Sequence, residues 1–513
     1  MMTTATASKP YDQLISHVKD AMLLSSTGSL LGWDQEALMP KGGVEHRARQ
    51  LAQLARITHQ MGTDPRIEGW LSDCEADKSV MGEPTSIAAV NVREVREAYD
   101  KATKLPEALV VEISQTTSQA KHIWADARKQ NDFAAFKPWL EKIVGLNLRK
   151  AECYGWDEAG GGEPWDALAD NFESGMTAAQ VSGVFVPLRE RLVALLDDIR
   201  GSASGPSNAF NELKLPIEQQ KAFVTDIAKA IGFDFDRGRL DTSTHPFCSG
   251  THCNDIRLTT RFHEDNVNDA LGSTMHECGH GIYEQGLLEE HIGTPMGEAV
   301  GLSIHESQSR MWENQVGRSR AFWVWCYPKL AEYFGDAIQG ISEDDIYGGA
   351  NIVTPGLIRV EADEATYNMH IMIRFEIERA LLKGDLAVAD LPEAWNAKYE
   401  EYLGVAVPDD ARGCMQDIHW AMGAMGYFPT YTMGNLYSAQ LYEQAKEELG
   451  DLDAMFAKGE FTPLRTWLNE NIHAHGKRYK SAALCEKVTG KPLSADPLMR
   501  HLEGKLRPLY GLR

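Results

Sequence analysis

The stretch Met275-His276-Glu277-Cys278-Gly279-His280 places two histidines four residues apart, with a glutamate directly after the first. On a helix this spacing puts both imidazoles on one face, one turn apart, so both can reach a single zinc ion. The glutamate then lies beside the open side of the metal, where it can take a proton from bound water. We expect Asn268 or Asp269 to cap this helix. Its apolar face is formed by Ala270, Leu271, Met275 and Ile282.

A catalytic zinc needs a third protein ligand, and two downstream glutamates qualify. Glu298 and Glu306 follow the motif, and we expect both on one helix over about 296–317. They would then lie about two turns apart on the same face, so either could bind the metal while the other orients a histidine. His305 points about 100° away from Glu306 and is the weaker ligand.

A second group of histidines and cysteines precedes the motif, in His245-Pro246-Phe247-Cys248 and His252-Cys253. Imidazole and thiolate are the ligands of structural zinc, so this group could hold a second metal. Its spacing fits no standard structural site, however. A loop that feeds an active site is the alternative interpretation.

The composition is that of a globular protein, with 43% hydrophobic and 24% charged residues. A formal net charge of −23 disfavours nucleic acid and anionic membranes as partners. The first ten residues are polar, which predicts no signal peptide, and no apolar run is long enough for a membrane span. The cysteines are scattered rather than paired, which favours reduced thiols and a cytoplasmic location.

Apolar residues recur at helical spacing along most of the chain. The expected helices cover 11–31, 44–61, 136–153 and 178–199, begin at Pro84 and Pro106, and resume at 319–332, 357–383, 392–403, 434–449 and 461–475. Alternation over Asn254–Phe262 predicts one strand, whose edge beside the metal helix could hold an extended peptide. We therefore predict a mostly α protein with a small β-sheet beside the zinc helix.

No convincing linker interrupts this pattern, so we expect one domain over residues 1–513. Within it we expect a helical lobe over about 1–240, a zinc-site and substrate-groove region over about 241–440, and C-terminal helices over 441–513.

Several further motifs follow one another along the chain. They are Gly32-Trp33-Asp34-Gln35-Glu36 with Met39-Pro40, His245-Pro246-Phe247, Asp255-Ile256-Arg257-Leu258-Thr259, His305-Glu306-Ser307-Gln308, Ile358-Arg359-Val360-Glu361-Ala362-Asp363 and Gly413-Cys414-Met415-Gln416-Asp417-Ile418-His419-Trp420. Together with the histidine motif, they resemble the carboxypeptidase Taq family of metallocarboxypeptidases along most of the length. None of these positions departs from the family pattern.

The resemblance implies a helical body with two lobes around a deep active-site groove. It implies a Zn2+ cofactor, for which Co2+ can substitute, and it favours Glu306 over Glu298 as the third ligand. The expected activity is release of single residues from peptides with a free C-terminus, with broad preference and little action on proline. A homodimer is expected on the same ground.

The chemistry and the resemblance together assign expected catalytic roles. Zinc held by His276, His280 and Glu306 would lower the pKa of its bound water, and Glu277 would take the proton and pass it to the leaving amine. The developing oxyanion needs a hydrogen-bond donor. The candidates are Tyr431, which we favour, then His419, and Tyr427.

An exopeptidase must also hold the terminal carboxylate of its substrate, which arginine does with two hydrogen bonds. Arg359 is the first choice, at the start of the expected helix over 357–383, and Arg257 on the expected strand is the alternative. Arg359 could instead form a structural ion pair with Asp363. Further residues expected to bind substrate or orient these groups are His245, Gln416 and Asp417.

Two other functions fit the same residues. An oligoendopeptidase or dipeptidase would use the same zinc chemistry on a different bond. A catalytically idle peptide-binding helical protein could keep the metal for stability alone. The intact Glu277 argues against the idle scaffold, because a structural zinc site needs no general base.

Overall fold

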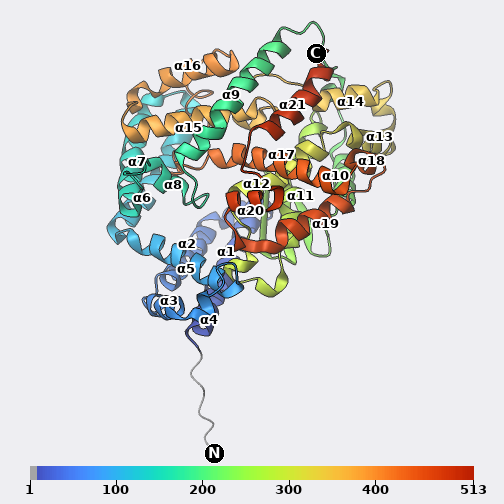
Figure 1. Cartoon of the computed structure of the whole chain (residues 1–513). Coiled ribbons are helices and arrows are strands. Elements are labelled where there is room, and N and C mark those ends of the chain that lie inside the picture. Colours follow the sequence, from blue (N-terminus) through green and yellow to red (C-terminus); the bar gives the residue numbers. More distant parts are fainter. Residues whose placement is uncertain (1–8) are drawn as a thin grey trace, which may run out of the picture.

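A computed structural model of the chain describes residues 9–513 and shows a mostly helical protein with one three-stranded sheet in this range (Figure 1). The helices before the sheet are α1 (Pro10–Ala37), α2 (Val44–Gly62), α3 (Arg66–Ala76), α4 (Lys78–Met81), α5 (Ile87–Lys104), α6 (Glu107–Gln130), α7 (Phe133–Tyr154), α8 (Pro164–Ala169), α9 (Ala178–Arg200) and α10 (Ile217–Ile231). Those after it are α11 (Val267–Gly286), α12 (Leu302–Arg310), α13 (Arg320–Phe334), α14 (Glu343–Ala350), α15 (Tyr367–Lys383), α16 (Leu391–Leu403), α17 (Pro429–Leu449), α18 (Leu452–Phe456), α19 (Thr462–Asn471), α20 (Ser481–Thr489) and α21 (Asp496–Leu509). The predicted fold class is therefore confirmed.

The described residues bear on two of the three expectations about targeting and redox state. No helix among them is long and apolar enough to cross a membrane. All eight cysteines are unpaired, as the scattered spacing predicted. Residues 1–8, where the sequence predicts no signal peptide, lie outside the described range.

The sheet contains β1 (Gly238–Thr242), β2 (Phe247–His252) and β3 (Asp255–Thr260), in the order β1-β3-β2. β3 confirms the predicted strand, and its buried Ile256 and Leu258 face the core. It is parallel to β1 and antiparallel to β2, so both of its edges are already hydrogen-bonded. The expectation that this strand offers an open edge to a peptide is wrong. The unpredicted strands β1 and β2 occupy the two outer positions.

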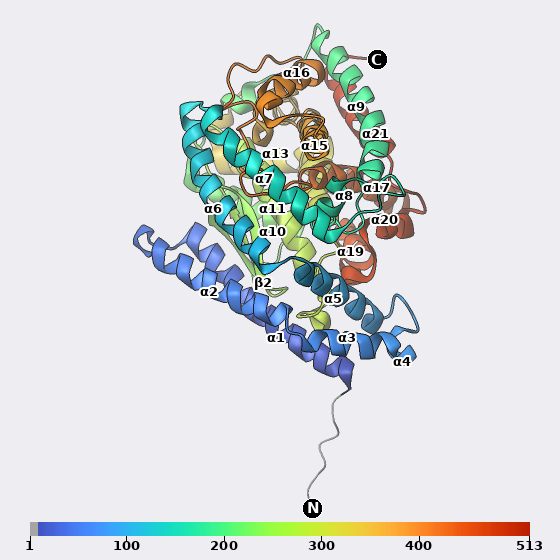
Figure 2. The same cartoon turned by 90° about the vertical axis from the view of Figure 1, so that its left-hand side faces the viewer.

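Helix α1 lies along the sheet on the face that carries Arg257, below the rest of the molecule in Figure 2. The ring of Trp33 is 4.3 Å from the guanidinium carbon of Arg257 and 4.9 Å from that of Arg239. These arginines are neighbours across β1 and β3, and Asp241 and Asp255 each bind one of them. The two acids offset the like-charge repulsion across the strands.

The metal helix α11 begins earlier than predicted. Asn266, rather than Asn268 or Asp269, caps it, accepting a hydrogen bond from the backbone N–H of Asp269 at 3.0 Å. The side chain of Asp269 instead binds Arg261 at 2.7 and 2.8 Å. Asp269 lies inside the first turn, where it is the donor of the capped backbone N–H and not the cap.

The expected helix over 296–317 is divided into three pieces. A 3₁₀ turn at Pro295–Gly297 is followed by extended chain, then α12, then a π-helical segment at Met311–Val316. The helix can begin only after Gly301, because the carboxylate of Glu173 fills the space there and accepts the backbone N–H of Ser303 at 2.8 Å. Glu298 therefore does not share a helix face with Glu306, and it pairs with Lys477.

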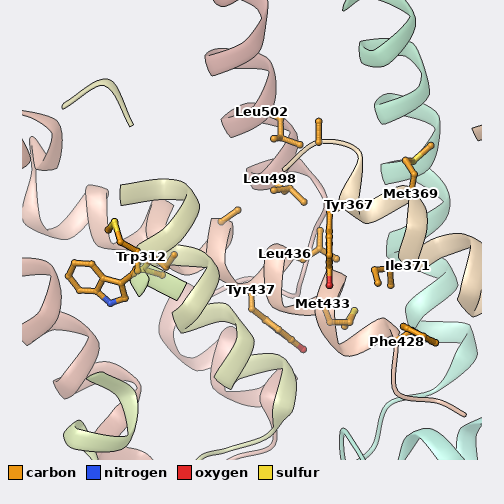
Figure 3. Packing of buried hydrophobic residues seen from close by; sticks show 14 of the residues in the cluster. Trp312, Tyr367, Met369, Ile371, Phe428, Met433, Leu436, Tyr437, Leu498 and Leu502 are labelled. Atoms are coloured by element: carbon orange, nitrogen blue, oxygen red, sulfur yellow. The ribbon is translucent and has the colours of Figure 1, made fainter. Parts of the chain in front are cut away.

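Three helices pack unusually closely at the centre. A Cβ atom on Gly279 of α11 would lie 2.5 Å from the Cα of Ser309 in α12. A Cβ atom on Gly434 of α17 would lie 2.5 Å from the Cγ of Glu306. Helix α17 is buried along most of its length (Figure 1), and Figure 3 shows its Met433 and Leu436 beside Tyr367. Glycine at the two crossings lets α11, α12 and α17 meet around one point.

We predict that Gly279→Ala lowers the free energy of unfolding by about 1–3 kcal/mol, because the new methyl group must push apart two backbones. Urea unfolding of chelator-treated protein measures this. Gly272→Ala is the matched control, since it lies on the same helix and a Cβ there meets nothing within 4 Å. That variant should be neutral or up to about 1 kcal/mol more stable. Equal losses in both variants would contradict the close crossing.

Candidate active site

The side chains of His276, His280 and Glu306 converge at the crossing of α11 and α12. Their ligand atoms all lie within 4.8 Å of one another. Oε2 of Glu306 is 3.7 Å from Nε2 of His276 and 3.5 Å from Nε2 of His280. In a tetrahedral zinc site such atoms are about 3.3 Å apart. Two imidazoles and one carboxylate at this spacing fit a divalent metal, and no other such group occurs within residues 9–513.

Each of the two histidines makes a contact through Nδ1, the ring nitrogen that does not face Glu306. Nδ1 of His276 is hydrogen-bonded to Oε2 of Glu313 at 2.9 Å. Nδ1 of His280 lies 2.5 Å from Nδ1 of His305, and Nε2 of His305 is 2.8 Å from Oε1 of Glu284. These bonds place the Nδ1 protons on the outer side, so both Nε2 atoms are free to bind a metal. His305 thus lies against the Nδ1 side of His280 and is not among the side chains that converge with Glu306.

The protonation states of His280 and Glu306 suit metal binding, whereas the pKa of His276 is raised because the effect of burial is outweighed by Glu306 and Glu313. Burial, together with the nearby His305, lowers the pKa of His280 to about 3, which keeps its imidazole neutral. Burial alone would raise the pKa of Glu306, but Arg310 and the histidines hold it well below its usual value. Neutral imidazole and ionised carboxylate are the forms that coordinate metals.

Glu277 is the acid next to His276, and only 5% of its surface is exposed. Burial raises its pKa to about 7, opposed by His276 and supported by Glu306 and Glu313. A carboxylate with a pKa near neutrality can both take and return a proton, as general acid–base catalysis requires.

Arg359 lies in a buried charge network with Asp417. Its Nε and Nη2 atoms donate to Oδ1 of Asp417 at 3.0 and 2.9 Å, and Nη1 donates to the hydroxyl of Tyr367 at 3.0 Å. Oδ2 of Asp417 accepts from Nε of Arg374 at 2.7 Å. Oε1 of Gln416 accepts from the backbone N–H of Arg359 at 2.9 Å, so Gln416 and Asp417 both fix this arginine.

The expected ion pair between Arg359 and Asp363 does not form. Asp363 accepts the backbone N–H groups of Thr354, Ala365 and Thr366 at 2.9–3.0 Å. A side chain that accepts the N–H groups two and three residues later marks the start of a helix, and α15 begins at Tyr367. The expected helix over 357–383 is therefore wrong in its first ten residues.

The candidate oxyanion donors surround the same arginine. The Tyr431 ring is 5.3 Å from the guanidinium carbon of Arg359, and Tyr427 lies next to it at 5.4 Å between ring centres. Tyr431 also precedes Gly434 by about one turn of α17, which places it near Glu306. Burial raises the pKa of Tyr431 well above its usual value, so its hydroxyl keeps its proton.

His419 packs against the Phe428 ring at 4.5 Å and the Tyr427 ring at 5.4 Å. Burial, opposed by Asp417, lowers the pKa of its imidazole to about 4, and its Nδ1 atom is buried with no hydrogen-bond partner among the described residues.

Two expected substrate-binding residues lie elsewhere. Arg257 is engaged by Asp255 and Trp33 on the α1 side of the sheet. His245 lies exposed in the connection between β1 and β2, where its carbonyl accepts the hydroxyl of Ser243. Neither residue contacts the metal-ligand group in the structure.

The second histidine–cysteine group belongs largely to β2, with His245 before it and Cys253 after it. Strand β2 is one wall of a groove of about 1460 Å³, which α1, α2 and α5 line from the other side. Glu284 and His305 also line this groove, so it adjoins the residues that contact the Nδ1 side of His280. A position beside the site accounts for this group better than a second zinc.

The buried Glu378 anchors the chain that leads to the tyrosines. It accepts hydrogen bonds from the indole N–H groups of Trp165 and Trp420 and from the backbone N–H of Gly426, at 3.2, 2.9 and 2.9 Å. Burial raises the pKa of Glu378 to about 7.

Sequence reasoning missed Glu313, Arg310, Glu284 and Glu378. Arg310 could have been found, because it follows Glu306 by one helical turn and their side chains meet. Glu313 could have been found as well, because seven residues are about two turns and an ordinary helix places it on the same face as Glu306. The other two become relevant only through distant contacts.

Comparisons with known proteins agree along the whole chain. The family model described as "Carboxypeptidase Taq (M32) metallopeptidase" matches residues 13–506. The chain is 47% identical over 511 residues to thermostable carboxypeptidase 1 of Thermus thermophilus, covering 99% of this chain and 100% of that protein. It is 37% identical over 498 residues to carboxypeptidase 1 of Bacillus subtilis, covering 97% of each. The crystal structure of the M32 carboxypeptidase from Deinococcus radiodurans R1 matches with a TM-score of 0.94 at 40% identity, covering 98% of this chain and 100% of that one.

We predict that Glu313→Gln weakens metal binding about 10–100-fold, because the amide holds His276 less firmly than the carboxylate. Competition between the protein and a chromophoric chelator for Zn2+ measures the change. Glu332→Gln, which alters an exposed acid on α13, is the matched control and should bind as the wild type does. An unchanged affinity in Glu313→Gln would remove the orienting role.

A second prediction concerns pH. The pKa of Glu378 is raised from 4.5 to about 7. As the pH rises, the unfolded state therefore loses this proton at a lower pH than the folded state does. Its contribution to the free energy of unfolding is therefore present below about pH 4.5 and lost as the pH rises to 7. The difference in this free energy between wild type and Glu378→Gln should change by about 1–3 kcal/mol between pH 5 and pH 8. Urea unfolding at both pH values tests this, and parallel behaviour of the two proteins would refute it.

Proposed function

The chain belongs to the carboxypeptidase Taq (M32) family and is a metallocarboxypeptidase, and from this premise we propose that it uses zinc, held by His276, His280 and Glu306, to release single residues from peptide C-termini. The observation that supports this most directly is the convergence of three ligand atoms beside the buried Glu277.

A divalent metal bound here would polarise the scissile carbonyl and lower the pKa of the attacking water. Glu277 takes the proton of that water and delivers it to the leaving amine. Tyr431, with its hydroxyl protonated, donates a hydrogen bond to the carbonyl oxygen as negative charge develops there. His419 is the alternative donor, because its neutral imidazole also carries one N–H.

Arg359 binds the terminal carboxylate of the substrate in this proposal. Its hydrogen bonds to Asp417 and Tyr367 use three of the five N–H groups of a guanidinium, so two remain. Arg359 and Tyr431 are neighbours, which brings the carboxylate clamp close to the oxyanion donor. Gln416 and Asp417 hold the arginine in place.

The remaining properties rest on the family resemblance alone. We propose a broad side-chain preference with little action on proline, replacement of Zn2+ by Co2+ with retained activity, a homodimer, and a cytoplasmic location.

Mass spectrometry of peptide digests tests the proposed activity. One peptide has free ends, one is N-acetylated and one is C-amidated, and each is incubated with and without a chelator. We expect a ladder of single-residue losses from the C-terminus that acetylation leaves unchanged and that amidation or chelation stops. Internal cuts would instead indicate an oligoendopeptidase, and hydrolysis of an added dipeptide with no cut in the longer peptides would indicate a dipeptidase. No cleavage by metal-loaded protein would indicate an idle peptide-binding scaffold.

Glu277→Gln should abolish turnover, because an amide cannot accept the proton, and it should keep the metal, because Glu277 is not a ligand. Metal content by mass spectrometry and peptide hydrolysis are measured on the same sample. Full activity in this variant would exclude the proposed general base.

Arg359→Lys should lower the ratio of kcat/KM for free-acid over amidated peptides about 10–100-fold, since a bidentate bond to a carboxylate becomes a single contact. Arg374→Lys is the matched control, because Arg374 binds the other oxygen of Asp417 and is fully buried. We expect it to keep the ratio even if its stability falls. If the wild type, Arg359→Lys and Arg374→Lys all show the same kcat/KM ratio, Arg359 does not bind the terminal carboxylate.

A further inference from the structure

Arg310 stands at the end of α12, directly behind the metal-ligand group. Its Nε donates to Oε1 of Glu306 at 2.7 Å, and its Nη1 donates to Oε2 of Glu313 at 3.2 Å. Only 14% of its side chain is exposed. One guanidinium therefore binds both a proposed metal ligand and the acid that orients His276.

The two oxygens of Glu306 are consequently unequal. Oε1 is turned toward Arg310, and Oε2 is turned toward the Nε2 atoms of His276 and His280. The side chain is confined as well, because Gly434 of α17 lies so close to the Cβ and Cγ of Glu306 that a methyl group would not fit there, and the hydroxyl of Ser309 donates to Oε2 at 3.1 Å. Glu306 therefore presents a single oxygen to the histidines.

Arg310 is itself held in one orientation. Its guanidinium lies over the ring of Tyr367, 4.5 Å from the ring centre, and the hydroxyl of Tyr367 accepts the hydrogen bond from Arg359. Stacking and a planar fork of donors are properties of arginine that lysine lacks. The arrangement thus depends on the shape of the side chain as well as on its charge.

We propose that Arg310 is a positioning residue that restricts Glu306 to coordination through one oxygen and, through Glu313, aligns His276. This inference rests on the proposed metal site. A carboxylate that binds through both oxygens takes an additional coordination position, and a catalytic zinc must keep one open for water or substrate. Without Arg310, Oε1 would be free to swing onto the metal and close that position.

The Co2+-loaded protein tests this, because cobalt absorbs visible light more strongly when it has four ligands than when it has five or six. Arg310→Met should weaken the visible absorption, raise the Kd for Co2+ or Zn2+ about tenfold or more, and lower kcat with little change in KM. Arg310→Lys can hold Oε1 but not both acids, so it should restore the absorption in part.

Arg318→Met is the matched control, because Arg318 binds Oε1 of Glu313 at 3.1 Å and does not contact Glu306. We expect it to keep the wild-type absorption. An unchanged spectrum in both Arg310→Met and Arg310→Lys would overturn the proposal, and should Arg310→Met fail to fold, the spectrum of Arg310→Lys decides alone. Failure of the wild type to bind Co2+ would refute the metal site, and with it this inference. Failure to cleave peptides, with the cobalt spectra as expected, would refute the proposed activity alone.

Discussion

The buried carboxylate of Glu306 is the constraint on which the centre of the molecule depends. A buried charge is tolerated only with a partner, and Arg310 provides one at 2.7 Å. The pair has to fit at a point where α11, α12 and α17 converge, and this is why Gly279 and Gly434 carry no side chain there. Burying the Glu306–Arg310 pair therefore requires the close helix crossings. The same crossings set the distance between Glu306 and the two histidines of α11.

The sequence predicted what local geometry controls. The spacing of His276 and His280 specifies a shared helix face, and alternation identified β3, so both were found. Local periodicity could not choose between Glu298 and Glu306, because α12 begins where Glu173, far away in the sequence, accepts a backbone N–H group. The strands β1 and β2 escaped detection because they are only partly buried and lack the clear alternation of β3. The roles proposed for Arg359, Tyr431 and His419 still rest on motifs together with their proximity in space.

Tyr367 connects the two halves of the proposed site. Its ring supports Arg310 behind the metal ligands, and its hydroxyl binds Arg359 on the side proposed for the substrate carboxylate. It is buried against α17, as Figure 3 shows. The separation between the point of attack and the terminal carboxylate would then be set by one rigid aromatic ring. A fixed separation of this kind suits an enzyme that selects the bond to cut by its distance from the chain end and not by the neighbouring side chains.

The π-helical segment Met311–Val316 contains one residue more than an ordinary helix would need, as the bond from the N–H of Gly317 to the carbonyl of Trp312 records. Each residue turns a helix by about 100°, so removing one residue from this segment would rotate everything after it relative to α12, including Arg318, which binds Glu313. The length of the chain in this segment, rather than the identity of one residue, therefore sets how Arg318 meets Glu313.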